Sequence, residues 1–296
     1  MPEGHTIHRL ARDQMKTIAH QRLRITSPQG RFADHATLIS GKRLTRIEAA
    51  GKHLFYHFGR DLILHVHLGL FGKYRTHDNP PPSPRGAVRV RFQGVERTVD
   101  LNGPNQCEVI DRAEYESILA RLGPDPLRAD ANPSRAWERI HASRAPIGLL
   151  LMDQSVIAGI GNIYRSEILH LLKIHPRTPG AQITRKQFDQ LWTLAKRLLE
   201  LGVKHNRIIT IDEKDLPKNV ERTPRNKLFR IFKKPHCPTC AGELEQFKLA
   251  SRKVFACPRC QQVATFSADQ SGPRGTRSAD LQPTRRTRPA RRSTHS

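Results

Sequence analysis

The stretch GLLLMDQSVIAGIGNIYRSEILHLL, residues 148–172, decides how the middle of the chain folds. Its apolar spacing predicts a helix that ends near Asp153, a turn that contains Gly159 and Gly161, and a second helix that begins near Asn162. We expect Asn162 to cap the second helix, and the free N–H groups at that helix end to form an anion site. The stretch therefore predicts two helices joined by a glycine turn that binds a phosphate group.

Two other interpretations of this turn are open. The pair Gly159-x-Gly161 is part of a dinucleotide-binding pattern, but the third glycine is absent and the preceding segment is helical. An ordinary helical hairpin buried in a core is the plainer alternative. The charge of the chain favours a phosphate ligand over both.

The chain carries a large excess of positive charge. Its 296 residues include 51 Lys and Arg against 27 Asp and Glu, which gives a formal net charge of +24. Such an excess favours a polyanionic partner, DNA or RNA before an anionic membrane surface. No signal peptide is recognisable, and no apolar run approaches the ~20 residues of a membrane span. We therefore expect a cytosolic protein that binds nucleic acid.

Four of the five cysteines form two CxxC pairs, Cys237 with Cys240 and Cys257 with Cys260, sixteen residues apart. Two such pairs place four thiolates around one ion and predict a structural zinc site with no open position for catalysis. A redox CxxC is the alternative, which the doubled spacing disfavours. Nine Lys and Arg against two Glu over residues 225–260 suit a phosphate backbone, although a transcription factor or a ribosomal protein would also carry such a module.

The remaining segments predict an α+β chain. After a helix near residues 7–18, short apolar runs between Gly, Pro and Asp clusters predict antiparallel strands in a sandwich or barrel. These strands are expected at residues 44–49, 53–58, 62–68, 87–92 and 96–100. The expected divisions are an N-terminal β-sandwich domain (1–120), to which the family resemblance described below gives the catalytic role, a linker (121–133), a helical DNA-binding domain (134–227), a zinc finger (228–266) and a disordered basic tail (267–296).

The second residue is a candidate nucleophile. Removal of Met1 leaves Pro2 with a free α-amine, whose pKa of about 7.7–8.0 leaves roughly a tenth of it neutral at pH 7. A lysine near 10.4 is far less often neutral. A secondary amine that attacks an aldehyde-like carbon gives an iminium, so Pro2 is predicted to act through a Schiff base.

Four motifs now identify a family. They are MPEGHTIHRL at the start, AAGKHLF around Lys52, IAGIGNIYRSE around Asn162, and the closing CPTC with SRKVFACPRCQ. Over about residues 2–262 the chain resembles the Fpg/Nei family of DNA glycosylases. Its opening Pro-Glu-Gly and HLGLFG at 67–72 resemble most closely the actinobacterial Nei proteins (endonuclease VIII).

The resemblance implies a bifunctional enzyme of base excision repair in the bacterial cytosol. It would remove oxidised bases, pyrimidines preferred, and nick the DNA by β,δ-elimination. Pro2 would attack C1′ of the damaged nucleotide, and Glu3 would act as the general acid/base. Lys52 would contact a phosphate beside the lesion and assist the chemistry.

Further roles follow from the same resemblance. Asn162 and Arg252 would bind phosphates, and Leu70 and Phe71 would fill the gap left by the flipped base. Taken alone, Leu70 and Phe71 would more often belong to a core. The expected partner is damaged double-stranded DNA, with single-stranded or bubble DNA as alternatives, and the protein is expected to be a monomer with one zinc ion.

The chain departs from the family pattern at several positions. His5 and Thr6 stand where relatives often have a second Pro-Glu, so any help from a second glutamate is absent. Ser251 replaces the glycine that usually precedes Arg252, and Gly69 stands where some relatives have a polar residue. Ser251 weakens the assignment of Arg252, and Leu70 and Phe71 lack the polar neighbour that some relatives have.

Two rival functions are open. An Fpg-type enzyme that prefers 8-oxoguanine is the nearest, and residues 205–226, where a base-capping loop would lie, do not exclude it. A non-catalytic zinc-finger protein that only binds DNA is the second, and the Pro2-Glu3 pair argues against it.

Overall fold

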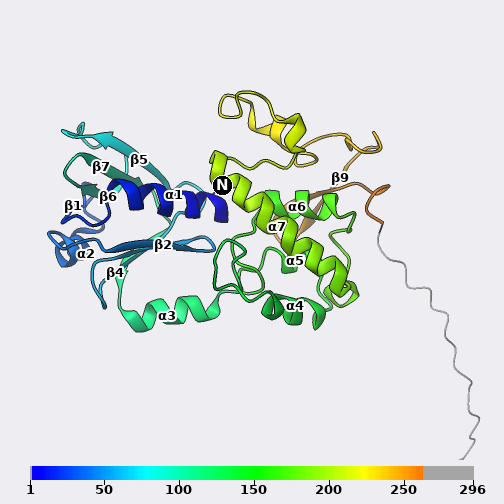
Figure 1. Ribbon diagram of the computed structural model, residues 1–296, viewed down its shortest axis with the longest axis horizontal. Coiled ribbons are helices and arrows are strands. Elements are labelled where there is room, and N and C mark those ends of the chain that lie inside the picture. Colours follow the sequence, from blue (N-terminus) through cyan, green and yellow to red (C-terminus); the bar gives the residue numbers. More distant parts are fainter. Residues whose placement is uncertain (1, 263–296) are drawn as a thin grey trace, which may run out of the picture. The chain divides into compact units, whose positions relative to one another are not determined.

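Two antiparallel four-stranded sheets form the first part of the protein in the computed structural model, which describes residues 2–262 (Figure 1). One sheet has the order β1-β6-β7-β5 and the other β2-β3-β4-β8. The expected tail at 267–296 and the last residues of the predicted zinc finger lie outside the described residues. The strands are β1 (Arg24–Thr26), β2 (Arg46–Ala50), β3 (His53–His57), β4 (Ile63–His67), β5 (Lys73–Asp78), β6 (Val88–Gln93), β7 (Arg97–Asn102) and β8 (Gln106–Ile110).

A buried apolar core joins the two sheets. Alternate residues of β3 and β7, such as Leu54, Tyr56, Val99 and Leu101, contribute to this core, as strands with one face inward should. Helix α1 (Gly4–Thr17) adds Ile7 and packs against β2. The predicted sandwich of the α+β class is therefore confirmed.

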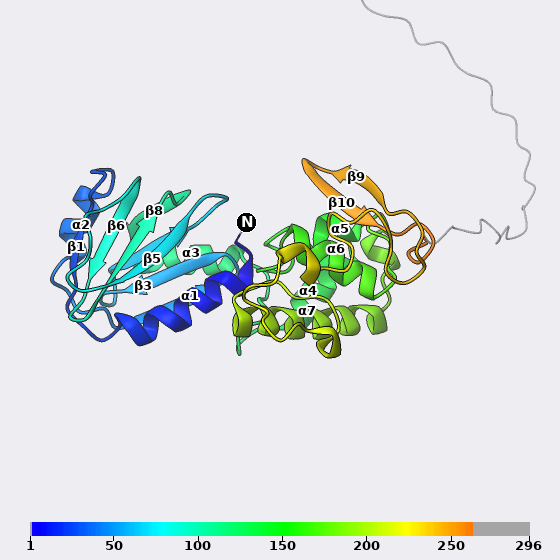
Figure 2. The same cartoon turned by 90° about the horizontal axis from the view of Figure 1, so that it is seen from above.

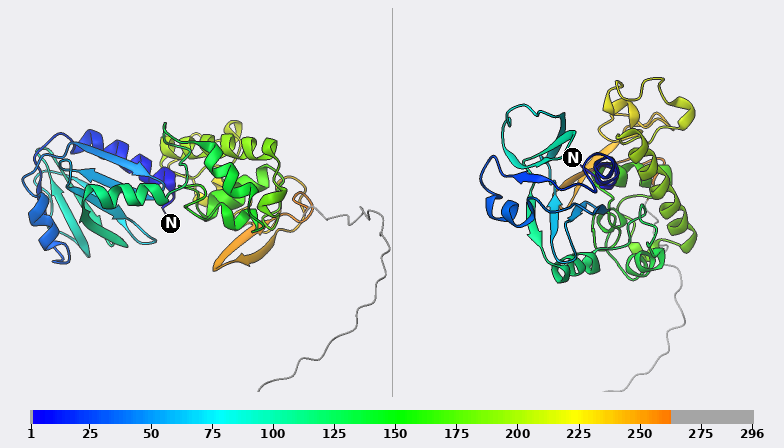
Figure 3. Two further views of the ribbon diagram at one scale, coloured as in Figure 1. Left: turned by 90° about the horizontal axis from the view of Figure 1, so that it is seen from below. Right: turned by 60° about the vertical axis from the view of Figure 1, so that its left-hand side comes forward.

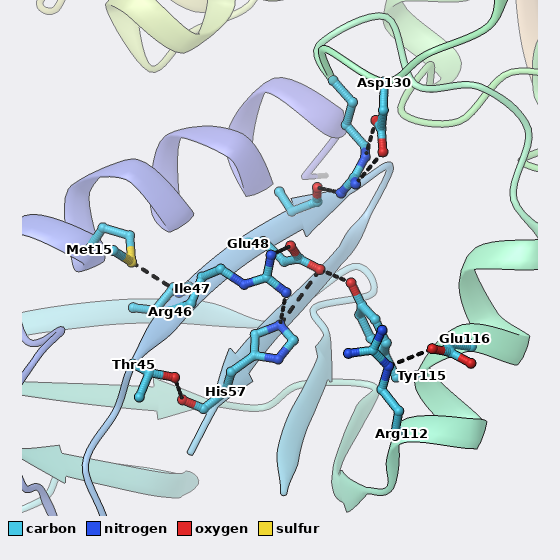
Figure 4. A network of polar contacts seen from close by, with 12 residues as sticks. Met15, Thr45, Arg46, Ile47, Glu48, His57, Arg112, Tyr115, Glu116 and Asp130 are labelled. Carbon is cyan, nitrogen blue, oxygen red and sulfur yellow. Dashed lines mark hydrogen bonds and ion pairs between the residues drawn. The ribbon is translucent and has the colours of Figure 1, made fainter. Parts of the chain in front are cut away.

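Helix α3 (Arg112–Arg121) covers the other face of the second sheet, so β3 is buried on both sides. Figure 4 shows the polar network beside this contact, in which Tyr115 and His57 converge on Glu48. Burial would raise the pKa of Glu48, but hydrogen bonds from His57 and Tyr115 and the charge of Arg46 lower it to about 2. An ionised, hydrogen-bonded Glu48 thus fastens α3 to the sheet.

A second buried apolar core lies among the helices. The long helix α7 (Arg185–His205) contributes Phe188, Leu191 and Leu198 to it. Within the described residues, no helix is both long and apolar enough to cross a membrane. The remaining helices and helical turns are α2 (Ala33–Ile39), α4 (Pro133–His141), α5 (Ile147–Leu150), α6 (Asn162–Leu171), η1 (Gly180–Gln182), α7 (Arg185–His205), η2 (Glu213–Asp215) and η3 (Arg225–Leu228).

A two-stranded hairpin lies near the C-terminal end of the described residues. Strands β9 (Glu245–Leu249) and β10 (Arg252–Ala256) pair antiparallel, and β10 packs against α6 (Figures 2 and 3). Gln261 holds the segment that follows β10. Its side-chain Nε2 donates to the Ile174 carbonyl, and its Oε1 accepts from the Cys257 N–H. The hairpin is thereby held to the helical core.

Several elements differ from their predicted form. The helix expected to end near Asp153 is only the four-residue α5, because the chain turns repeatedly from Leu151 to Gly161. Strands β1, β5 and β8 and helices α2 and α3 were not predicted from the sequence. Strand β5 (KYRTHD) lies at a sheet edge with mostly exposed side chains, so it lacks the apolar alternation that predicts a strand.

Candidate active site

Pro2 lies where two cavities adjoin. The smaller, of about 250 Å³, is also lined by Lys52, His67, Leu70, Met152 and Arg252. The larger, of about 430 Å³, also contains His5, Thr6, Tyr74, Arg207, Arg225 and Phe229. The fold thus brings three predicted site residues to Pro2: Lys52 from the turn between β2 and β3, Leu70 from the turn between β4 and β5, and Arg252 from the β9–β10 hairpin.

Glu3 lies next to Pro2 but is fully buried. Its Oε1 accepts a hydrogen bond of 3.0 Å from the N–H of Ile163, at the start of α6, while Oε2 is buried without a hydrogen-bond partner among the described residues. The group that lies at the α6 N-terminus in this structure is therefore the Glu3 carboxyl group. The expectation that Asn162 caps α6 is wrong, because Asn162 is already helical and Gly161 is the capping residue, without a side chain to bond.

Burial is the largest cause of the pKa shifts of Glu3 and Lys52. Burial raises the pKa of Glu3 above its ordinary 4.5, and the charge of Lys52 and the N–H groups of α6 offset this only in part. Burial likewise lowers the pKa of Lys52, which Glu3 opposes. Glu3 is consequently a better proton donor near neutral pH than an exposed glutamate, as a general acid requires.

Asn162 and Arg165 connect α6 to the β9–β10 hairpin. The Asn162 amide Nδ2 donates to the Lys253 carbonyl at 3.1 Å, and the guanidinium of the fully buried Arg165 donates to Asn162 Oδ1 and to the Gly148 carbonyl. Arg165 therefore orients the Asn162 amide. The sequence analysis missed Arg165, although an arginine inside the GNIYRSE motif was a visible signal.

Leu70 and Phe71 occupy the turn between β4 and β5. They are 52% and 83% exposed, which excludes the core position that such side chains usually take. The turn is tight, because a Cβ at Gly72 would lie 2.4 Å from the Leu68 carbonyl oxygen. Leu70 borders the Pro2 cavity, whereas Phe71 is not among the residues that line it.

The four predicted cysteine ligands lie together. Their sulfur atoms are within 4.8 Å of one another, with 3.8 Å between Cys237 and Cys260 and 3.5 Å between Cys240 and Cys257. A tetrahedral ion with sulfur at about 2.3 Å separates its ligands by about 3.8 Å, so the cluster fits a four-coordinate zinc. Cys107 lies on β8 and is no part of the cluster.

Replacing Gly161 by alanine is expected to reduce, by about 100-fold, the base excision that the sequence resemblance implies, because small displacements of catalytic groups act on this scale. A Cβ at Gly161 would lie 2.3 Å from the Glu3 carboxyl carbon, so the carboxyl must move. Single-turnover excision measures the effect. Gly180→Ala is the matched control, since its Cβ would lie 2.4 Å from the carbonyl oxygen of Ile140, a residue of the helical core that lines neither cavity at Pro2. Equal rates for G161A and wild type would contradict the expectation.

Two family profiles match most of the chain. The formamidopyrimidine-DNA glycosylase N-terminal domain matches residues 1–106, and the formamidopyrimidine-DNA glycosylase H2TH domain matches residues 122–213.

Curated relatives and solved structures extend the match. "Endonuclease 8 1" of Mycobacterium tuberculosis is 46% identical over 268 residues, which cover 88% of this chain and 100% of the relative. Formamidopyrimidine-DNA glycosylase of Chloroflexus aurantiacus is 31% identical, over 77% of this chain and 83% of that one. Fpg of Lactococcus lactis, solved with DNA that contains N7-benzyl-Fapy-dG, has a TM-score of 0.74 and 24% identity, over 88% of this chain and 100% of that one, and so shares the fold.

Proposed function

Because this chain belongs to the Fpg/Nei family of DNA glycosylases, which are also AP lyases, we propose that it removes oxidised pyrimidines from DNA through the amine of Pro2 and then nicks the strand by β,δ-elimination. We also propose that it acts as a monomer on damaged duplex DNA in the bacterial cytosol. The domain division expected from the sequence is part of this proposal.

The position of Pro2 between two cavities carries the proposal. Lys52 and Arg252 make the smaller cavity cationic, which suits the sugar-phosphate of the damaged nucleotide. The larger cavity, on the other side of Pro2, has the room and the hydrogen-bonding groups for a flipped base. A nucleotide that spans both would present C1′ to the Pro2 nitrogen.

The chemistry follows from the two groups at that point. The neutral Pro2 amine, freed by removal of Met1, forms a bond to C1′ while the bond from C1′ to the base breaks, and the proton of the amine leaves with the base. The bond from C1′ to the ring oxygen breaks next. Glu3 gives its proton to the ring oxygen, and the nitrogen lone pair becomes the iminium bond. Loss of a proton from C2′ then expels the 3′-phosphate, and a second elimination expels the 5′-phosphate.

Base flipping needs compensation, since unstacking costs a few kcal/mol. The exposed Leu70 and Phe71 would fill the gap in the stack, and Asn162 and Arg252 would bind phosphates on either side. One structural zinc, bound by Cys237, Cys240, Cys257 and Cys260, would hold the hairpin that presents Arg252. The zinc supplies shape to the fold and no step of the reaction.

The protonation state of Glu3 gives a test that needs no DNA. Because burial raises its pKa, Glu3 should stay protonated at pH values where exposed carboxyl groups are ionised, and lose its proton as the pH rises through the raised value. Lys52 lowers this pKa, so Lys52→Gln should move the transition to higher pH. Infrared titration of the protonated carboxyl band, assigned by its loss in Glu3→Gln, measures both. A Glu3 that titrates like an exposed glutamate would contradict this assignment.

The choice of damaged base rests on the larger cavity. Burial lowers the pKa of His5 to about 3, so it is a neutral hydrogen-bonding group there, beside Thr6 and the cationic Arg225. The described residues that line this cavity include no carboxylate. Excision of thymine glycol, dihydrouracil and 8-oxoguanine, compared at equal enzyme concentration, tests the preference. We expect the two pyrimidines to be removed faster, and a clear preference for 8-oxoguanine would favour the Fpg-type alternative.

Borohydride trapping tests the mechanism. Wild-type protein with an abasic or oxidised duplex should give a covalent adduct after reduction, together with a strand nick. Binding with a steep salt dependence but neither adduct nor nick would instead indicate a non-catalytic DNA-binding protein.

A further inference from the structure

The segment between the sheets and the helices contains one buried carboxylate, Asp125, which is 3% exposed. Its Oδ2 accepts a hydrogen bond of 2.7 Å from the Gly51 N–H and lies 2.7 Å from Nε2 of His8. Its Oδ1 accepts from the Leu127 N–H at 2.9 Å. One side chain therefore contacts its own segment, helix α1 and the turn between β2 and β3.

The contacts of Asp125 with Gly51 and with His8 both lie close in sequence to the proposed catalytic residues. Gly51 immediately precedes Lys52, and its φ of +58° is a left-handed conformation that glycine adopts without strain. His8 lies one turn into the helix that begins just after Glu3. Asp125 thus joins the backbone that carries Lys52 to the helix that carries Pro2 and Glu3.

The turn that contains Gly159 and Gly161 lies at the same place. A Cβ at Gly159 would lie 3.6 Å from the Gly4 Cα, 3.7 Å from Asp125 Oδ1 and 3.8 Å from the Gly51 Cα. The Gly4 N–H donates to the Gly159 carbonyl at 2.8 Å. Three other chain segments therefore meet at Asp125: helix α1 through His8, the turn between β2 and β3 through Gly51, and the turn that contains Gly159.

The backbone around Asp125 strengthens this junction. The Gly123 N–H donates to the Gln154 carbonyl, and the Pro124 carbonyl accepts from the Ala158 N–H. On the other side, Arg128 donates to the Ala49 carbonyl of β2 at 3.2 Å. The linker is bonded to both halves, and Asp125 is the part of it that reaches the catalytic segments.

We propose that Asp125 is a positioning residue for the reaction, whose carboxylate holds the Lys52 turn against helix α1 so that Lys52, Pro2 and Glu3 keep their mutual geometry. This role rests on the proposed function of those three residues. Asp125 does not line either of the two cavities at Pro2. Its loss should slow the chemistry and leave DNA binding nearly unchanged.

The substitution Asp125→Asn tests the proposal, because the amide keeps the shape but has one acceptor fewer and no charge. We expect kcat for strand cleavage and the rate of borohydride trapping to fall by about 10- to 100-fold, as for a small misplacement of catalytic groups. The Kd for duplex with an uncleavable tetrahydrofuran site should stay within about threefold, since Asn162 and Arg252 are unaltered.

Asp100→Asn is the matched control. Asp100 is also 3% exposed and is ion-paired with Arg91 in the other sheet, away from Pro2. D100N should lower the thermal stability without lowering kcat of the folded protein. If D125N does not fold, Asp125→Glu, which keeps the charge but lengthens the side chain, is measured in the same way.

The outcomes separate the two proposals. Unchanged trapping in D125N, or equal losses in D125N and D100N, would overturn the positioning role. A rise of Kd that parallels the fall of kcat would also overturn it, because the two changes together would show a general structural defect. Absence of any adduct with the wild type would instead refute the proposed function itself.

Discussion

Strand cleavage should fall by at least about 1000-fold when the amine of Pro2 is blocked, the scale on which loss of a nucleophile acts. A Gly-Ser extension retained before Pro2 converts the amine into an amide, whose nitrogen lone pair is delocalised and does not attack C1′. Lys52 and Arg252 are unaltered, so binding to undamaged duplex should persist. Gel-based nicking and fluorescence anisotropy measure the two effects.

The matched control carries the same Gly-Ser extension at the C-terminus. It should nick at the wild-type rate. Mass spectrometry of each protein must confirm whether Met1 is absent and the extension present. If the N-terminally extended protein nicks normally, another residue is the nucleophile and the role of Pro2 is refuted.

The second large effect concerns the metal cluster. Cys257→Ser removes one of four ligands, and structural zinc contributes about 10–16 kcal/mol to the folding of small zinc modules. The hairpin that bears Arg252 should lose its structure, and the Kd for duplex should rise by about 100-fold or more, as loss of several phosphate contacts implies. Metal analysis and binding titrations at fixed salt measure both changes.

Cys107→Ser is the control for this experiment, because Cys107 lies outside the cluster on β8. It should keep one zinc per chain and the wild-type Kd. The cores of the sheets and of the helices contain none of the four ligands, so most of the secondary structure should survive in C257S. Unchanged DNA binding by a zinc-free C257S protein would contradict the role given to the cluster.

The sequence predicted the fold where apolar periodicity or ligand spacing is strong. The two CxxC pairs predicted the cluster, and the runs at residues 53–58 and 62–68 predicted β3 and β4 because these strands are buried. Strand β5 was not predicted because most of its side chains are exposed to solvent. Helix α3 could have been found from the capping box of Asp111 and Glu114, which the structure contains.

The site was predictable only where a motif marks it. Pro2, Lys52 and Arg252 stand in motifs, and the fold brings them to one cavity. No local pattern shows that Glu3 binds the start of α6, because that contact spans 160 positions of the chain. Asp125 escaped for the same reason, since its partners Gly51 and His8 are distant in sequence.

Identification of the trapped residue tests the central claim most directly. Wild-type protein is reduced with borohydride on an abasic duplex, digested with protease and nuclease, and the modified peptide is sequenced by mass spectrometry. We predict that the sugar remnant is attached to the nitrogen of Pro2 at the N-terminus of the mature chain. Attachment to Lys52 or to any other lysine would contradict the mechanism.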